Sequence, residues 1–207
     1  MSITIFIIVV TVAISLWAWN DASIMNRLIM NPYQVASRGQ YYRLLTSGFL
    51  HADWGHLIFN MLSFYFFGSY IEQLFAYLFG PIYAVWLIGF YLVAIIVSDL
   101  PTFFKHRTNP GYNSLGASGG VSAIIFASIL FRPLTPLYLM FIPIPIPGFI
   151  FGLFYLAYSF YESRRGNSNI NHDAHIYGAL FGIVFMIVAY PGVVGSFFEQ
   201  VASWRLF

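Results

Sequence analysis

Long apolar segments with few charges constrain the fold of this chain more than any other feature. A run of about 17–25 apolar residues can cross the hydrocarbon core of a bilayer as one helix. Only 8% of the 207 residues are charged and 59% are hydrophobic, whereas soluble domains carry about 25% charged residues. The sequence therefore predicts an all-α polytopic membrane protein with six transmembrane helices. The predicted spans are Ile3–Trp19, Gly55–Phe75, Phe79–Ser98, Gly116–Phe131, Gly148–Glu162 and Asp173–Tyr190.

Alternating prolines predict an extended segment before the fifth span. Pro143, Pro145 and Pro147 each lack a backbone N–H, and each disfavours helix in the residue before it. Extended backbone does not face lipid, because its polar groups would lack hydrogen-bond partners there. We therefore expect Pro133–Pro147 to lie at the membrane interface or against protein, and the fifth helix to start near Gly148.

The predicted organisation is a single membrane domain over residues 1–207, without a convincing internal repeat. Its first loop, residues 20–53, is long, polar and aromatic. The apolar N-terminus lacks a basic region and a small-residue cleavage site, so we interpret it as a retained first span. A cleaved signal peptide is the alternative.

The last segment, residues 193–207, follows Pro191-Gly192, which is expected to end the sixth span. In this segment Phe197, Val201 and Trp204 share one helical face. Such a face predicts an interfacial helix at the C-terminal end.

The second, fourth and sixth spans all begin on the same side of the membrane, because the chain crosses twice between them. Ser118 begins the fourth span and His175 lies near the start of the sixth. From these residues the two spans have about 14–16 residues and rise about 21–24 Å, less than a core of about 30 Å. Ser118 and His175 are therefore predicted to meet in a recess that opens to one side.

The segment Gly116-Ala117-Ser118-Gly119-Gly120 surrounds a serine with small residues. Small neighbours permit a tight turn and the close approach of another backbone or a substrate. Free N–H groups at a helix N-terminus also suit a developing oxyanion. The pattern matches the nucleophile elbow of α/β-hydrolases, but that turn follows a strand of a parallel sheet, which is not predicted here. An ordinary helix-packing motif of small residues is the alternative.

His175 precedes the glycine pair Gly178 and Gly182. Glycines four residues apart bring a helix close to its neighbour, and His175 lies on nearly the same face. A neutral imidazole in that contact can accept a serine proton and later return it to a leaving amine. The alternative is a structural histidine bonded to a loop carbonyl. Ser118, which lies at a matching depth on the fourth span, makes this alternative less favoured.

His56 and Asn60 lie four residues apart, on one face of the second span. An imidazole and a carboxamide can both donate hydrogen bonds to an oxygen anion, and losing one such donor costs about 2.7–4 kcal/mol of transition-state stabilisation. A polar pair that faces lipid headgroups is the alternative.

Together, these motifs resemble the rhomboid family of intramembrane serine proteases. Three segments of the first loop add to the resemblance: Tyr42-Arg43, Leu45-Thr46 and Phe49-Leu50-His51, with tyrosine where the family has tryptophan. The resemblance covers about residues 41–190 and implies a six-transmembrane-helix rhomboid-like bundle.

The resemblance also implies roles for individual residues. Ser118 would be the nucleophile and His175 the general base of a dyad, with no role for Asp173 in a triad. His56, Asn60 and the Ser118 backbone N–H would form the oxyanion hole. In the first loop, the Arg43 side chain would be a structural hydrogen-bond donor. Four glycines would support the site: Gly116, Gly119, Gly178 and Gly182.

The implied function is an intramembrane serine endopeptidase that cleaves transmembrane segments of other proteins and needs no cofactor. Its expected partners are those substrates and the lipid bilayer, and the oligomeric state stays open. The main alternative is a catalytically inactive rhomboid-like protein that binds membrane helices, although such proteins typically lack the serine or the histidine. A transporter or channel with proton-relaying histidines is a second alternative, but spans one, three and five offer few ionisable residues.

Other chemistries lack their residues. The chain has no cysteine, which excludes disulfides and thiolate catalysis, and it has no His-Glu-x-x-His zinc motif. Asp99 and Asp173 are expected at loop edges, so no aspartate pair lies within the spans. The formal charge of +2 is too small to indicate a nucleic-acid partner. No metal site is predicted, because the spacing of four loop residues matches no ligand pattern: His51, Asp53, His106 and His172.

The distribution of basic residues conflicts with the usual orientation of the family. The positive-inside rule would place the active-site side in the cytoplasm, whereas bacterial rhomboid proteases generally open it outward. We favour the family orientation and expect a bacterial inner (plasma) membrane. The active-site side has Arg27, Arg38, Arg43, Lys105, Arg107, Arg164 and Arg165, and the opposite side has Arg132 and Arg205.

Overall fold

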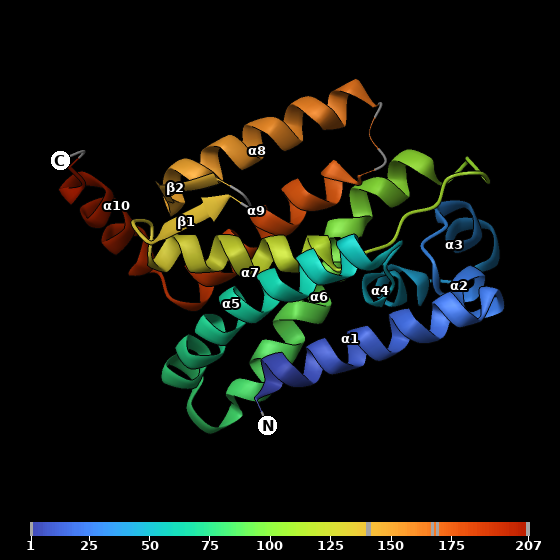
Figure 1. Cartoon of the computed structure of the whole chain (residues 1–207), viewed down its shortest axis with the longest axis horizontal. Coiled ribbons are helices and arrows are strands. Elements are labelled where there is room, and N and C mark those ends of the chain that lie inside the picture. Colours follow the sequence, from blue (N-terminus) through green and yellow to red (C-terminus); the bar gives the residue numbers. More distant parts are fainter. Residues whose placement is uncertain (1, 140–141, 167, 169, 206–207) are drawn as a thin grey trace.

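A computed structural model describes residues 2–139, 142–166, 168 and 170–205 of the protein. Six helices in this described part have at least 14 residues, and each corresponds to one predicted span (Figure 1). They are α1 (Ile3–Asn20), α5 (Trp54–Phe79), α6 (Tyr83–His106), α7 (Ser118–Phe131), α8 (Gly148–Arg165) and α9 (His172–Ala189).

In the described part of the chain, three helical segments are long and apolar enough to cross a membrane: α1, the stretch Trp54–His106 and α9. The stretch Trp54–His106 includes both α5 and α6, and the chain turns back between them at the 3-10 turn η2 (Gly80–Ile82) (Figure 1). α7 is a shorter apolar helix. These features confirm an all-α polytopic membrane protein, while the number of six crossings stays a prediction.

The predicted end of the third span was wrong. α6 continues past Ser98 to His106, so Asp99 lies inside a helix and not at a loop edge. The Asp99 side chain is almost fully buried and accepts a hydrogen bond from Ser47 Oγ at 3.1 Å. Pro101 also lies within α6, where it removes one backbone hydrogen bond without ending the helix. Contacts with the rest of the protein therefore extend this helix beyond its apolar run.

The first loop contains short helices that the sequence analysis did not predict: α2 (Ala22–Leu28), α3 (Pro32–Arg38), α4 (Arg43–Thr46) and the 3-10 turn η1 (Ser47–Phe49). Side-chain caps start two of them, because Asp21 accepts from Ser23 N and Asn31 accepts from Gln34 N. These helices lie together at one end of the bundle (Figure 1).

The proline-rich segment is extended, as predicted. Strands β1 (Pro136–Leu139) and β2 (Ile142–Pro147) pair antiparallel. A two-stranded ribbon tolerates prolines, because its outer edges need no N–H donors for a further strand. The ribbon lies beside the start of α8, near the terminal helix α10 (Val193–Ser203) and far from the first-loop helices (Figure 1). The interfacial position of α10 stays a prediction.

α7 is the central helix and packs against α5, α6 and α9 (Figure 1). Eleven of its 14 residues are buried. Small residues on several neighbours permit these close approaches; for example, a Cβ on Gly120 would lie 2.7 Å from the Tyr91 ring of α6. The central position of α7 holds Ser118 inside the bundle.

Candidate active site

Ser118 is the first residue of α7 and follows a turn that requires glycine. Gly116 has a φ of +128°, a conformation that residues with a Cβ rarely adopt. Its N–H donates to the Ser47 carbonyl oxygen at 3.0 Å, which ties the turn to the first loop. The Ser118 side chain is half-buried. The start of α7 therefore presents a hydroxyl beside free helix N–H groups.

Glycines bring the backbones of α7 and α9 into direct contact below the site. A Cβ on Gly178 would collide with the backbone of Gly119, at 2.8 Å from its carbonyl carbon, and a Cβ on Gly182 would lie 2.8 Å from Ala123 Cα. Gly119 is also close to the Ala174 carbonyl oxygen, since a Cβ on Gly119 would lie 3.4 Å from it. Gly119 and Ala174 directly adjoin Ser118 and His175 in the sequence, so these contacts bring together the backbone segments that carry the serine and the histidine.

His175 is half-buried in the first turn of α9. Its ring stacks on Tyr155 of α8 with centroids 5.8 Å apart and packs edge-on against His172 with centroids 5.6 Å apart. Among the described residues, no hydrogen bond joins the His175 ring to Ser118. Serine–histidine bonds are often long in proteins without substrate and shorten only in the reacting complex. The lack of this bond in the substrate-free structure is therefore compatible with a serine–histidine dyad.

His56 lies in the first turn of α5, with its ring beside the turn that precedes Ser118. A Cβ on Gly116 would lie 2.7 Å from His56 Cε1, 2.8 Å from His56 Nε2 and 3.9 Å from Ser118 Oγ. The His56 ring, the glycine turn and the serine hydroxyl are thus neighbours. Asn60 is buried, and its Nδ2 donates to the His56 carbonyl oxygen at 2.9 Å. The amide of Asn60 is therefore bonded to its own helix in this structure, and its role in an oxyanion hole stays a prediction.

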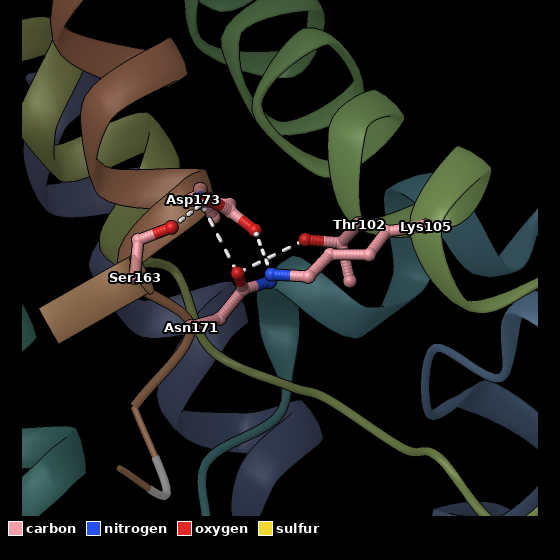
Figure 2. Close-up of polar contacts among 6 residues, drawn as sticks. Thr102, Lys105, Ser163, Asn171 and Asp173 are labelled. Atoms are coloured by element: carbon pink, nitrogen blue, oxygen red, sulfur yellow. Dashed lines mark hydrogen bonds and ion pairs between the residues drawn. The ribbon is translucent and has the colours of Figure 1, made fainter. Parts of the chain in front are cut away.

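A polar cluster at the start of α9 holds the turn that contains His175 (Figure 2). Asn171 caps the helix by accepting from Ala174 N at 3.1 Å, and it accepts from Thr102 Oγ1 of α6 at 2.9 Å. Asp173 pairs with Lys105 of α6 at 3.1 Å and accepts from Ser163 of α8. The cluster joins α6, α8 and α9. Within it, Lys105 and Ser163 bind the carboxylate of Asp173, which is the acidic residue nearest to His175 in the sequence.

Arg43 stabilises the first loop from within. Its side chain is buried and donates to the Asn26 carbonyl at 2.9 Å, the Ile29 carbonyl at 2.7 Å and Gln40 Oε1 at 2.7 Å. These bonds join α4 to the segment that contains α2. Arg43 is thus a hydrogen-bond donor within the loop that supplies Ser47 to the glycine turn.

His51 lies in the connection between η1 and α5 and is fully buried. Its Nδ1 is 3.0 Å from Ser15 Oγ, and its ring packs edge-on against His56 with centroids 4.9 Å apart. Burial, and secondarily the neighbouring His56, lower the pKa of His51 to about 3. His51 is therefore neutral at physiological pH, and its ring packs against the ring of His56.

The structure adds site neighbours that the sequence analysis missed. Ser47 binds Asp99 and the glycine turn, and Ser98 of α6 lies directly against Gly119. Ser122 of α7 is buried and bonds to the Tyr155 hydroxyl at 2.8 Å. A serine one turn after Ser118 was a usable sequence signal, because it lies on the same helix face as the predicted nucleophile. No local signal pointed to Tyr155.

The sequence analysis set aside a metal site at four loop residues: His51, Asp53, His106 and His172. Within the described ranges, no three histidine, aspartate or glutamate side chains gather closely enough to bind a metal ion.

The helices and this site define a polytopic membrane protein. A serine and a histidine lie in the first turns of two of its helices, α7 and α9, whose backbones are in contact. A family model described as "Rhomboid domain" matches residues 38–192. The chain is 35% identical over 176 residues to "RHOMBOID-like protein 12, mitochondrial" of Arabidopsis thaliana, with coverage of 78% of this chain and 50% of that protein. It is 29% identical over 174 residues to "Rhomboid-related protein 1" of Caenorhabditis elegans, with coverage of 81% and 45%. The chain belongs to the rhomboid family, as the resemblance predicted.

The chain spans about half the length of the curated relatives it matches. These relatives come from a plant and a nematode, and one is named as mitochondrial. They give no support to the predicted bacterial inner membrane. A multi-pass membrane protein is supported both by the family and by the apolar helices.

Proposed function

We propose that this protein is an intramembrane serine endopeptidase that cleaves transmembrane segments of other membrane proteins. The observation that carries the proposal is the direct backbone contact between α7 and α9 at Gly119 and Gly178, beside Ser118 and His175. The His56 ring, which lies beside Gly116, would supply a further hydrogen-bond donor near the serine. Membership of the rhomboid family supports the same chemistry.

In the proposed reaction, Ser118 Oγ attacks the carbonyl carbon of an unwound substrate peptide bond while His175 takes the hydroxyl proton. His56, Asn60 and the Ser118 N–H stabilise the oxyanion. The C–N bond then breaks as His175 protonates the leaving amine, which leaves an acyl-enzyme on Ser118. Water attacks this ester while His175 takes a proton from it. His175 then returns that proton to Ser118 Oγ as the ester C–O bond breaks, which releases the acid product and the free serine.

The test is cleavage of a transmembrane reporter by the purified protein in liposomes, with Ser118→Ala and His175→Ala as variants. Two matched control variants replace a serine and a histidine that lie outside the candidate site. Ser128→Ala removes a buried α7 serine whose hydroxyl donates to the Ile124 carbonyl of its own helix, and His106→Ala removes a histidine stacked on Tyr112. Cleavage by the wild type and both controls, with loss in both site variants, is expected.

The other outcomes separate the alternatives. Equal cleavage by Ser118→Ala and the wild type would contradict the assigned nucleophile. Binding of several reporters without cleavage by the wild type would favour an inactive rhomboid-like protein that binds membrane helices. Proton flux in liposomes that is unchanged by Ser118→Ala would favour a transporter or channel.

A further inference from the structure

His175 has an unusual set of neighbours for a catalytic base. In serine hydrolases the imidazole is commonly oriented by a third group, which bonds to its second nitrogen. Among the described side chains, none forms a hydrogen bond with the His175 ring. Asp173, the nearest carboxylate along the chain, points to Lys105 and Ser163 instead (Figure 2). The contacts that the described residues make with this imidazole are ring-packing contacts, with Tyr155 and His172.

Tyr155 of α8 supplies the face of that packing. Its ring lies nearly parallel to the His175 ring, with an interplanar angle of 21° and centroids 5.8 Å apart. Aromatic pairs of this kind contribute beyond the area they bury and restrict the tilt of both rings. His172 contacts His175 only edge-on, at an interplanar angle of 75°. Tyr155 is thus the aromatic neighbour that covers a face of the imidazole.

The hydroxyl of Tyr155 is bonded to the helix that carries the serine. Tyr155 Oη lies 2.8 Å from Ser122 Oγ, and Ser122 follows Ser118 by one helical turn, on the same face of α7. One tyrosine therefore contacts His175 with its ring and reaches the Ser118 helix with its hydroxyl.

The sequence of α8 directs Tyr155 inward. Gly148, Gly152 and Ser159 are the buried residues of this helix, and with Tyr155 they are spaced at four, three and four residues, which places them on one face. A Cβ on Gly152 would lie 3.2 Å from Phe126 of α7. Small residues on both sides of Tyr155 thus let α8 approach α7 closely enough for its side chain to reach the site.

We propose that Tyr155 is a positioning residue that sets the orientation of the His175 imidazole toward Ser118. The dyad is then assembled by three helices, with serine from α7, histidine from α9 and the orienting ring from α8. This inference rests on the proposed function, and it adds a residue on which the rate of proton transfer depends.

The test measures kcat and KM for reporter cleavage in liposomes, together with the rate at which a fluorophosphonate probe labels Ser118. Tyr155→Leu keeps an apolar side chain but removes the stacked ring. We expect kcat and the labelling rate to fall together by about 10- to 100-fold, as for a misplaced catalytic group, with little change in KM. Tyr155→Phe keeps the ring and loses the bond to Ser122, so its kcat should fall less than about fivefold.

Tyr161→Leu is the matched control, because Tyr161 also lies on α8 but is 59% exposed. It should cleave and label at the wild-type rates. Wild-type rates in Tyr155→Leu would overturn the inference, and so would an equal loss in Tyr155→Phe and Tyr155→Leu, since the ring would then not be the active feature. Failure of the wild type itself to cleave and label would instead overturn the proposed function. The two failures are therefore distinguishable.

Discussion

Gly178 of α9 lies against the backbone of Gly119 on α7 so closely that no Cβ fits between them. Their helices begin with the turns that carry His175 and Ser118. The distance between the proposed base and nucleophile is thus fixed by a contact that contains no side chain. A substitution at Gly178 must push the two helices apart.

We expect Gly178→Ala to lower the free energy of unfolding by about 1–3 kcal/mol, as overpacking does in other cores, and to reduce cleavage. Gly89→Ala on α6 is the control, because nothing lies within 4 Å of a Cβ at that position. Alanine there should leave stability unchanged or raise it by up to about 1 kcal/mol. Equilibrium unfolding in mixed detergent micelles measures both variants. Equal stability of the two variants would contradict the close contact.

Glu72 of α5 holds the start of α1. Its carboxylate accepts from Ile3 N at 2.8 Å and from Thr4 N at 2.9 Å, and it is nearly buried. Negative charge at a helix N-terminus is favourable, and hydrogen bonds to charged groups contribute about 1.5–3 kcal/mol. Glu72→Gln should therefore destabilise the protein by about 1–3 kcal/mol. Glu199→Gln on α10, where the side chain is exposed, should change stability little, and a similar loss in both variants would refute this role of Glu72.

His51 predicts a specific dependence of stability on pH. Its pKa is about 3 in the folded protein, against 6.5 for an unperturbed histidine. Below pH 6.5 the unfolded chain binds a proton that the folded protein does not, so this contribution is fully present above pH 6.5 and is lost as the pH falls toward 3. For this group alone, the loss at pH 5 is about 2 kcal/mol.

The measurement compares the unfolding free energy of the wild type and His51→Gln between pH 7.5 and pH 5. Glutamine does not titrate, so the variant should lose less stability over this range, whatever its stability at pH 7.5. Parallel curves for the two proteins would mean that His51 does not carry the effect.

The cluster at the start of α9 allows a comparison of two polar contacts. Lys105 is half-exposed in its ion pair with Asp173, and exposed pairs contribute about 0–1 kcal/mol. Asn171 caps the helix and bonds to Thr102, and loss of a cap costs about 0.5–2 kcal/mol. Asn171→Ala should thus destabilise the protein more than Lys105→Ala in thermal unfolding. The reverse order would show that the ion pair, and not the cap, holds this turn.

Much of the fold could be predicted because its signals are local. Apolar runs bounded by glycine and proline gave the starts of α7 and α8 at Ser118 and Gly148 to within two residues. The end of α6 could not be predicted, since the buried Asp99 receives a hydrogen bond from Ser47 of the first loop, a contact between segments distant in the sequence. The short helices of that loop have too few residues for a periodic pattern and depend on caps such as Asp21 and Asn31.

The same distinction applies to the candidate site. Ser118, His175, His56 and Asn60 are recognisable by spacing within single helices. Tyr155 is not, because its contact with His175 depends on how α8 packs on its neighbours. Contacts between helices are set by the shapes of both surfaces, which one sequence segment does not encode.

The most direct measurement of the central claim is covalent labelling of the purified protein with a fluorophosphonate, located by mass spectrometry. We predict that the wild type carries one adduct on the peptide containing Ser118, that Ser118→Ala carries none, and that His175→Ala reacts far more slowly. Ser128→Ala should label as the wild type does. An adduct on another serine, or equal labelling of the wild type and His175→Ala, would contradict a Ser118–His175 dyad.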